Sequence, residues 1–278
     1  MTKRECVSAD GVRVVYESEG SGDALLLLHG GFVQSRRVWA ERGWLERLAR
    51  EHRVILVDLR GHGESSRPKA AAAYGIEQIV LDLRAVLDAE RVECVSVVGY
   101  SFGAIVGARF ATHERRVAKL VLIGGAFGES IPAAMQTQVL ARLAQVEAAS
   151  RSGVDPKLTP MEAEFVRRAD LAVVRAAYTA MPSWPRVEPE DLRCPTLFIA
   201  GTENPWSMSS LDVYRDRLAK CGIEVALLPG ASHEAELAPE SNALERTAAY
   251  LRRFGSRKCA PRAHENGWPS EGSSAVSL

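Results

Sequence analysis

The feature that most constrains the fold is the pentapeptide Gly-Tyr-Ser-Phe-Gly at residues 99–103, which directly follows the apolar run 95–98. A helical pattern covers residues 104–112 after it. A serine that links a strand to a helix between two glycines sits in a turn too tight for a Cβ on either side. The segment therefore predicts a strand, a sharp turn and a helix with the Ser101 hydroxyl at the tip, the arrangement called a nucleophile elbow.

Apolar runs of strand length recur along the whole chain. Continuous rather than alternating runs are typical of strands buried on both faces, and hence of a mostly parallel sheet. Stretches with one apolar helical face, such as residues 76–87, separate these runs. The pattern predicts an α/β fold with a doubly wound, mostly parallel sheet. The predicted strands are an early antiparallel strand at 12–17 and buried strands at 24–28, 54–57, 92–98, 120–123, 196–200 and 225–228.

One interval between predicted strands is too long for a simple crossover. Residues 125–194, about seventy in number, contain helical pieces and repeated prolines but no convincing strand. We expect them to form a helical cap inserted into a core made of residues 1–124 and 195–255. Residues 256–278 carry Gly, Ser, Pro and charge without a periodic apolar face, which predicts a disordered tail.

Composition excludes several classes of partner. Lys plus Arg and Asp plus Glu both number 35 among 278 residues, so neither nucleic acid nor an anionic membrane is expected to bind. The charged amino terminus and the lack of eighteen consecutive apolar residues predict a soluble cytoplasmic protein. The five cysteines include no Cys-x-x-Cys pair and no metal spacing, which argues against both a disulfide framework and a zinc site. We expect neither a metal nor an organic cofactor. The oligomeric state is left open.

Two further motifs follow predicted strands at the same edge of the sheet as Ser101. His-Gly-Gly at residues 29–31 closes the first buried strand. The backbone N–H groups of Gly31 and Phe102 are expected to form an oxyanion hole there. His233 follows the last predicted strand in the loop Pro-Gly-Ala-Ser-His, where it is expected to act as the catalytic base.

Taken in order along residues 12–254, these motifs resemble the α/β-hydrolase superfamily. Asp-x-Arg-Gly-His-Gly-x-Ser at 58–65 and Pro-Glu at 239–240 add to the resemblance. The chain looks most like the cap-bearing bacterial group of esterases, lactonases, enol-lactone hydrolases and cofactor-free haloperoxidase-like enzymes. The resemblance implies a Ser, acid, His triad in that chain order, with a substrate pocket between sheet and cap. Asp58 and His62 are expected to shape the loop beside the site.

The chain departs from this family at the acid position. The family's acid follows the strand at 196–200 in a Gly-x-x-Asp turn, and in this chain Asn204 stands there. An amide can orient an imidazole but cannot stabilise the imidazolium. Either Glu203, one residue earlier, reaches His233, or an acid elsewhere, such as Glu129, serves. Otherwise Asn204 is native in an enzyme that needs only modest basicity, or it is an engineered change. At the acid position of a hydrolase, Asn204→Asp is expected to raise kcat/KM for a simple ester by roughly tenfold to ten-thousandfold.

The sequence therefore predicts a serine-dependent hydrolase of a small, largely apolar ester, lactone or thioester that acts through an acyl-enzyme. Ser101 attacks the substrate and His233 serves as base and then as acid. Asn204 or Glu203 orients His233. The alternative is a degenerate hydrolase fold that binds a small molecule or catalyses an elimination, decarboxylation or cyclisation, because the usual carboxylate is missing. Candidate side chains of the substrate pocket are Met181, Trp184, Trp206 and Met208.

Overall fold

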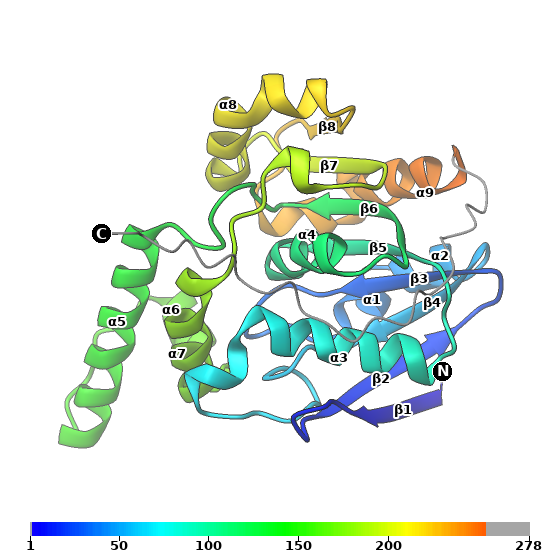
Figure 1. Cartoon of the computed structure of the whole chain (residues 1–278). Helices are drawn as coiled ribbons and strands as arrows, with labels where there is room; N and C mark the ends of the chain where they lie inside the picture. The colour runs from blue at the N-terminus through cyan, green and yellow to red at the C-terminus, as the bar shows by residue number, and fades with distance from the viewer. Residues whose placement is uncertain (1, 254–278) are drawn as a thin grey trace, which may run out of the picture.

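The chain folds around one eight-stranded sheet, and the computed structural model describes residues 2–253 (Figure 1). The strand order is β1-β2-β4-β3-β5-β6-β7-β8. β2 pairs antiparallel with β1 and with β4, and all the other neighbours are parallel. The strands are β1 Thr2–Val7, β2 Arg13–Glu19, β3 Asp23–Leu28, β4 His52–Val57, β5 Val95–Tyr100, β6 Val117–Ile123, β7 Thr196–Gly201 and β8 Glu224–Leu228.

Helices cover both faces of the sheet (Figure 1). Successive side chains of a strand point to opposite faces, so Leu26 and Leu28 of β3 pack in one layer and Leu25 and Leu27 in the other. The first layer contains α3, α4 and α8, and the second contains α1, α2 and α9. These helices are α1 Val38–Glu41, α2 Trp44–Leu48, α3 Ile76–Ala89, α4 Phe102–His113, α8 Pro205–Lys220 and α9 Ala243–Arg253, and a 3-10 helix η1, Ala71–Tyr74, precedes α3.

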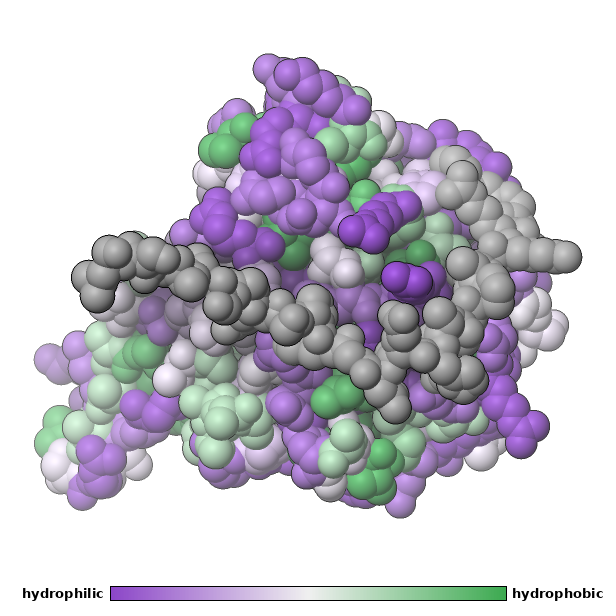
Figure 2. All heavy atoms as spheres, in the orientation of Figure 1, coloured by the Kyte–Doolittle hydropathy of each residue, from purple (hydrophilic) through white to green (hydrophobic). Residues whose placement is uncertain are grey.

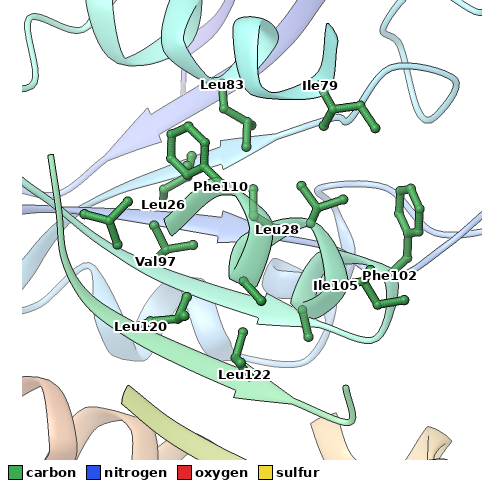
Figure 3. Packing of buried hydrophobic residues seen from close by; sticks show 14 of the residues in the cluster. Leu26, Leu28, Ile79, Leu83, Val97, Phe102, Ile105, Phe110, Leu120 and Leu122 are labelled. Atoms are coloured by element: carbon green, nitrogen blue, oxygen red, sulfur yellow. The ribbon is translucent and has the colours of Figure 1, made fainter. Parts of the chain in front are cut away.

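Helix α4 packs at the centre of the first layer. Its Phe102, Ile105 and Phe110 belong to one buried cluster with Leu28 of β3 and Val97 of β5 (Figure 3). Every residue of α4 from 102 to 110 is buried, so the helix has almost no exposed face in its first two turns. Because α4 begins directly after residue 101, this packing holds the elbow at one place on the sheet.

The predicted doubly wound, mostly parallel sheet is confirmed, and all seven predicted strands are present with small shifts at their ends. The structure adds β1, an edge strand that the list of predicted strands lacks. β1 pairs with β2 from Thr2 opposite Ser18 to Val7 opposite Arg13. Its side chains are mostly exposed, so no buried apolar run marks it in the sequence. Backbone pairing with β2, rather than burial of its own side chains, makes this segment a strand.

Between β6 and β7 lies a helical segment, residues 124–195, which we call the insertion. It extends to the left of the sheet in Figure 1. Within it the structure describes one isolated bridge, Gly128 to Val187, and no named strand. Its elements are α5 Ala133–Ser152, α6 Pro160–Arg168, α7 Leu171–Ala180, η2 Met181–Ser183 and η3 Pro189–Asp191.

The surface of the insertion carries hydrophobic as well as polar side chains. Met135, Val154 and Met161 are 41%, 62% and 78% exposed. Figure 2 shows hydrophobic residues at the left of the molecule, where α5 to α7 lie. None of the helices between residues 2 and 253 is long and apolar enough to cross a membrane. The predicted tail, residues 256–278, lies outside the described residues.

Candidate active site

The elbow predicted at residues 99–103 has a strained backbone at Ser101. This serine lies between the end of β5 and the start of α4, with φ 54° and ψ −115°. A non-glycine residue in such a conformation costs about 1–3 kcal/mol, so the surrounding packing must hold it. A Cβ on Gly103 would overlap the carbonyl oxygen of Leu28, and one on Gly99 would overlap the carbonyl of Gly103. The two glycines therefore let α4 cross β3 and β5 closely enough to present the Ser101 hydroxyl at the carboxyl edge of the sheet.

His233 meets this serine from the loop after β8. Its Nε2 lies 2.8 Å from the Ser101 Oγ, although 132 residues separate them in the sequence. The imidazole stacks on the Tyr100 ring with centroids 5.1 Å apart, and the Tyr100 hydroxyl donates to the carbonyl of His233 at 2.7 Å. Burial, with a smaller contribution from Glu236, raises the pKa of Tyr100 above its usual range, so this phenol stays a neutral donor. Tyr100 therefore contacts both the ring and the backbone of His233.

The carboxylate that contacts His233 is Glu236, which the sequence analysis did not single out. Glu236 lies on the 3-10 helix η4, Glu234–Leu237, and its Oε2 is 2.9 Å from His233 Nδ1. Its side chain is fully buried, and its Oε1 accepts the backbone N–H of Gly201 at 2.8 Å. In a 3-10 turn, residues three apart lie on the same side, which brings the Glu236 carboxylate to the Nδ1 edge of the ring. The spacing His-x-x-Glu after the last strand was the available signal.

Asn204 is also brought to His233, whereas Glu203 is not. Asn204 is 2% exposed, and its Nδ2 lies 3.0 Å from His233 Nδ1. Glu203 donates its backbone N–H to Ala231, and its side chain is exposed. The turn therefore directs Glu203 into solvent, and this geometry does not support it as the alternative acid.

Glu129, the other carboxylate that the sequence analysis considered, pairs with Arg186 at 3.0 Å. Both side chains of that pair are more than half exposed, at 58% and 55%. Glu129 is therefore engaged on the surface of the insertion rather than beside the imidazole.

The predicted oxyanion residues lie next to each other. A Cβ built on Gly31 would be 3.4 Å from the Cβ of Phe102, so the backbone of the His-Gly-Gly loop passes beside the start of α4. The next residue, Phe32, has φ 53° and donates its N–H to His62 Nε2 at 2.9 Å. His62 Nδ1 in turn lies 2.9 Å from the carbonyl of Arg60, which makes Nδ1 the protonated nitrogen. His62 thus fixes the loop that carries Gly31.

Asp58 also holds the loop that carries Gly31, through contacts with Arg36. It is fully buried, accepts the backbone N–H of Arg36 at 2.8 Å, and forms an ion pair with the Arg36 guanidinium. It also accepts the N–H of Glu64 at 2.8 Å. Both Asp58 and His62 therefore bond to backbone around the site, in agreement with the structural role expected for them.

Two buried histidines near the site make stability depend on pH. Burial lowers the pKa of His29 from 6.5 to about 4 and that of His62 from 6.5 to about 3. Both are therefore neutral in the folded protein but protonate in the unfolded chain below about pH 6.5. Stability is then lost as the pH falls through 6.5, and between pH 7 and pH 5 each histidine is expected to remove about 2 kcal/mol.

Urea unfolding of the wild type and of His62→Gln at both pH values tests this expectation. The glutamine retains an acceptor for Phe32 but does not titrate, so the variant should lose about 2 kcal/mol less than the wild type on acidification. An equal loss in both proteins would contradict the assignment of His62 as a buried neutral imidazole.

The predicted pocket residues divide into two pairs by burial. Met181 and Trp184 are 3% and 4% exposed and belong to the core cluster, whereas Trp206 and Met208 are half-buried against it. The Trp184 ring lies 6.0 Å from Phe102, the neighbour of the serine. Phe102 also contacts Phe32, at 5.6 Å between ring centroids. An aromatic surface therefore adjoins Ser101, and of the four predicted residues Trp184 contacts it.

Phe32 continues this surface to the insertion, because it contacts Tyr178 of α7 at 5.2 Å. The site is built from the loops at the carboxyl ends of β3, β5, β7 and β8 together with α7 of the insertion.

The described residues contain no group of three or more His, Cys, Asp or Glu side chains that could hold a metal ion.

Comparison with known proteins places this geometry in context. In sequence, the chain is similar to the 2-hydroxy-6-oxo-2,4-heptadienoate hydrolase of Pseudomonas putida, 36% identical over 120 residues that cover 42% of this chain and 43% of the relative. It is also similar to the rhodomycin D methylesterase DauP of a Streptomyces species, 42% identical over 117 residues that cover 39% of each. The chain thus matches less than half the length of these curated relatives.

Among solved structures, an esterase from Thermogutta terrifontis has a TM-score of 0.71 and 23% identity, covering 91% of this chain and 99% of that one. The bottromycin epimerase BotH has a TM-score of 0.71 and 25% identity, covering 90% of this chain and all of that one. A model of the "Alpha/beta hydrolase family" matches residues 25–250, from β3 to α9. The chain therefore belongs to the alpha/beta hydrolase family.

Proposed function

We propose that the protein is a serine hydrolase of a small, largely apolar ester, lactone or thioester. The observation that carries this proposal is the 2.8 Å contact between Ser101 Oγ and His233 Nε2. A serine hydroxyl has a high pKa and becomes a nucleophile only when an adjacent base takes its proton. The strained turn at Ser101 supports the proposal as well, because such backbone outliers concentrate at functional sites.

The reaction would proceed in two halves. The Ser101 Oγ attacks the carbonyl carbon while His233 Nε2 takes the hydroxyl proton, and the N–H groups of Gly31 and Phe102 stabilise the oxyanion. His233 then gives the proton to the leaving group as the bond to it breaks, which leaves an acyl-enzyme. Water deprotonated by His233 attacks the acyl carbon, and the proton returns to Ser101 as the acid product leaves.

The proposed substrate class follows from the side chains around the nucleophile. Phe102, Phe32 and Tyr178 form a continuous aromatic surface from the serine to α7. An apolar acyl or alkyl group packs on such a surface, and the insertion would serve as the cap that closes over it. Met181, Trp184, Trp206 and Met208 remain the proposed pocket residues, with Trp184 placed against Phe102. The name of the Streptomyces methylesterase states ester cleavage and supports this class, whereas the name of the Pseudomonas hydrolase supports hydrolysis in general.

A non-hydrolytic reaction is the second candidate function. It is supported by the similar fold of BotH, which is named as an epimerase. The sequence favoured a non-hydrolytic reaction because Asn204, rather than a carboxylate, stands at the acid position beside His233. Glu236 supplies a carboxylate 2.9 Å from the ring, which removes that argument. The hydrolase is therefore the better supported function.

Covalent labelling distinguishes the two candidates. A fluorophosphonate reacts with a serine only where a base and an oxyanion hole activate it. The wild-type protein is expected to be labelled in a time-dependent manner, with the label located on Ser101 by mass spectrometry. Heat-denatured protein is the control and should stay unlabelled. A native protein that remains unlabelled at Ser101 would favour the non-hydrolytic candidate.

A further inference from the structure

The carboxylate of Glu236 lies on the opposite side of His233 from Ser101. We propose that Glu236 is the acid that positions this imidazole, and that Asn204, at the place where the family carries its acid, has become the amide that holds Glu236. The acid has thus moved from the turn after β7 to the 3-10 helix η4. This inference rests on the proposed function, because an acid affects turnover only if His233 takes the proton of Ser101.

The hydrogens available in the cluster allow one arrangement. Asn204 Nδ2 has two hydrogens and lies 2.9 Å from Glu236 Oε1, 3.0 Å from Ser207 Oγ and 3.0 Å from His233 Nδ1. The Ser207 hydroxyl donates its own hydrogen to the carbonyl of Gly125 at 2.8 Å, so it accepts from the amide. Both amide hydrogens are then directed at oxygens, and none is left for His233.

His233 Nδ1 must therefore carry the hydrogen that bonds to Glu236 Oε2 at 2.9 Å. With its hydrogen on Nδ1, the ring presents a lone pair at Nε2 to the Ser101 hydroxyl. This is the tautomer that a general base requires. If Asn204 oriented the ring by donating to Nδ1, the hydrogen would sit on Nε2 and the base would be blocked. The geometry thus assigns the orienting role to Glu236 rather than Asn204.

Helix α8 determines which way the Asn204 amide points. Asn204 is the N-cap of α8, and its Oδ1 accepts the N–H groups of Trp206 at 3.2 Å and Ser207 at 3.3 Å. The reversed amide would turn Oδ1 toward the Glu236 carboxylate and NH₂ toward backbone donors. The helix start therefore makes the side chain a donor toward Glu236. With the Gly201 N–H at 2.8 Å, two neutral donors stabilise Oε1 of this buried carboxylate.

The same geometry explains why position 204 carries an amide. An aspartate there would place a second carboxylate about where Nδ2 now lies, 2.9 Å from Glu236 Oε1. Two carboxylates this close cannot both ionise without a large cost. Either they share a proton, or the pair holds His233 as an imidazolium that cannot act as a base. Asparagine at 204 is thus the partner that a buried Glu236 requires.

Single substitutions give the first test, with p-nitrophenyl acetate as the substrate. Glu236→Gln keeps the size of the side chain and removes its charge, so kcat is expected to fall by about ten-thousandfold, as in the corresponding change in a serine protease. The matched control is Glu234→Gln, an exposed residue of the same 3-10 helix, which should leave kcat unchanged. Asn204→Asp should lower kcat/KM by roughly tenfold, the reverse of the increase expected from the sequence.

A double variant gives the second test. Glu236→Gln combined with Asn204→Asp exchanges the charge between the two positions, and the glutamine amide can donate to the new carboxylate. The double variant is expected to turn over at least about tenfold faster than Glu236→Gln alone, because a carboxylate again lies beside Nδ1. A glutamate that only supported the fold would show no such recovery.

Nitrogen NMR of His233 gives a readout that does not depend on turnover. The wild type should show the ring protonated at Nδ1, and Glu236→Gln should lose that hydrogen-bonded signal while its circular dichroism spectrum stays unchanged. Wild-type tautomer and turnover in Glu236→Gln would overturn the inference. A wild type that is neither hydrolytic nor labelled by a fluorophosphonate would instead refute the proposed function, and the NMR signal would still decide whether Glu236 orients His233.

Discussion

Replacing Ser101 with alanine is expected to lower kcat for p-nitrophenyl acetate by about a million-fold, the effect of removing the nucleophile from a serine protease. The reason is that the proposed acyl-enzyme forms on the Oγ atom, and within residues 2–253 the other side chains that contact His233, those of Tyr100, Asn204 and Glu236, are not serine hydroxyls that could take its place. Alanine at this turn keeps the strained backbone and the packing of α4, so thermal stability should change by about 1 kcal/mol at most. Steady-state kinetics with a circular dichroism melt measure both quantities.

Ser209→Ala is the matched control for this change. Ser209 is an exposed residue of α8, so the same substitution there should leave both turnover and stability unchanged. A Ser101→Ala protein that retained a rate near that of the wild type, with an unchanged spectrum, would rule out the serine mechanism.

The second large effect concerns the stability of the loop at residues 58–65. The Arg60 side chain is fully buried and forms two 2.6 Å hydrogen bonds with Asp82 of α3. It also bonds to Asp10 at 2.8 Å and to the carbonyl of Ala73 at 2.6 Å. Arg60→Met removes the only cation in this set and leaves the buried Asp82 carboxylate unpaired. The expected loss is about 3–5 kcal/mol, equivalent to a fall in Tm of roughly 6–20 °C.

The exposed pair of Arg50 with Glu46 supplies the control, because its side chains are 65% and 80% exposed and surface pairs contribute about 0–1 kcal/mol. Arg50→Met should therefore leave Tm nearly unchanged. Arg60→Met with Asp82→Leu should be more stable than Arg60→Met alone, since no unpaired charge remains in the core. Equal Tm values for Arg60→Met and Arg50→Met would contradict the assigned role of the buried pair.

The central sheet could be predicted because burial marks it directly in the sequence. The runs at 24–28, 54–57 and 120–123 are apolar at nearly every position, and each became a strand covered on both faces. β1 lacks such a run and was missed, because its pairing with β2 depends on backbone hydrogen bonds that any side chain permits. Hydrophobic pattern therefore predicts the strands that are buried, but not an exposed edge strand.

The candidate site was predicted unevenly for a similar reason. Ser101 could be located because so tight a turn requires glycine two residues before it and two residues after it, at positions 99 and 103. His233 could be located because it follows the last buried strand. The acid could not be located from the sequence, because the family pattern pointed to the turn after β7, where Asn204 stands. Four carboxylates, at 203, 234, 236 and 240, lie near these loops in the sequence, and the spacing His-x-x-Glu is the one local signal that sets Glu236 apart.

The buried strands, the glycine-flanked elbow and the two residues that meet across it could be predicted from the sequence alone, because each depends on local sterics or on burial of a continuous apolar run. That Glu236 faces the imidazole while Glu203 faces solvent follows from tertiary packing alone. That choice depends on how one 3-10 turn after His233 packs against the end of β7, where the Gly201 N–H and the Asn204 amide meet the buried carboxylate. Such a contact joins segments 32 to 35 residues apart, and no periodicity within either segment encodes it.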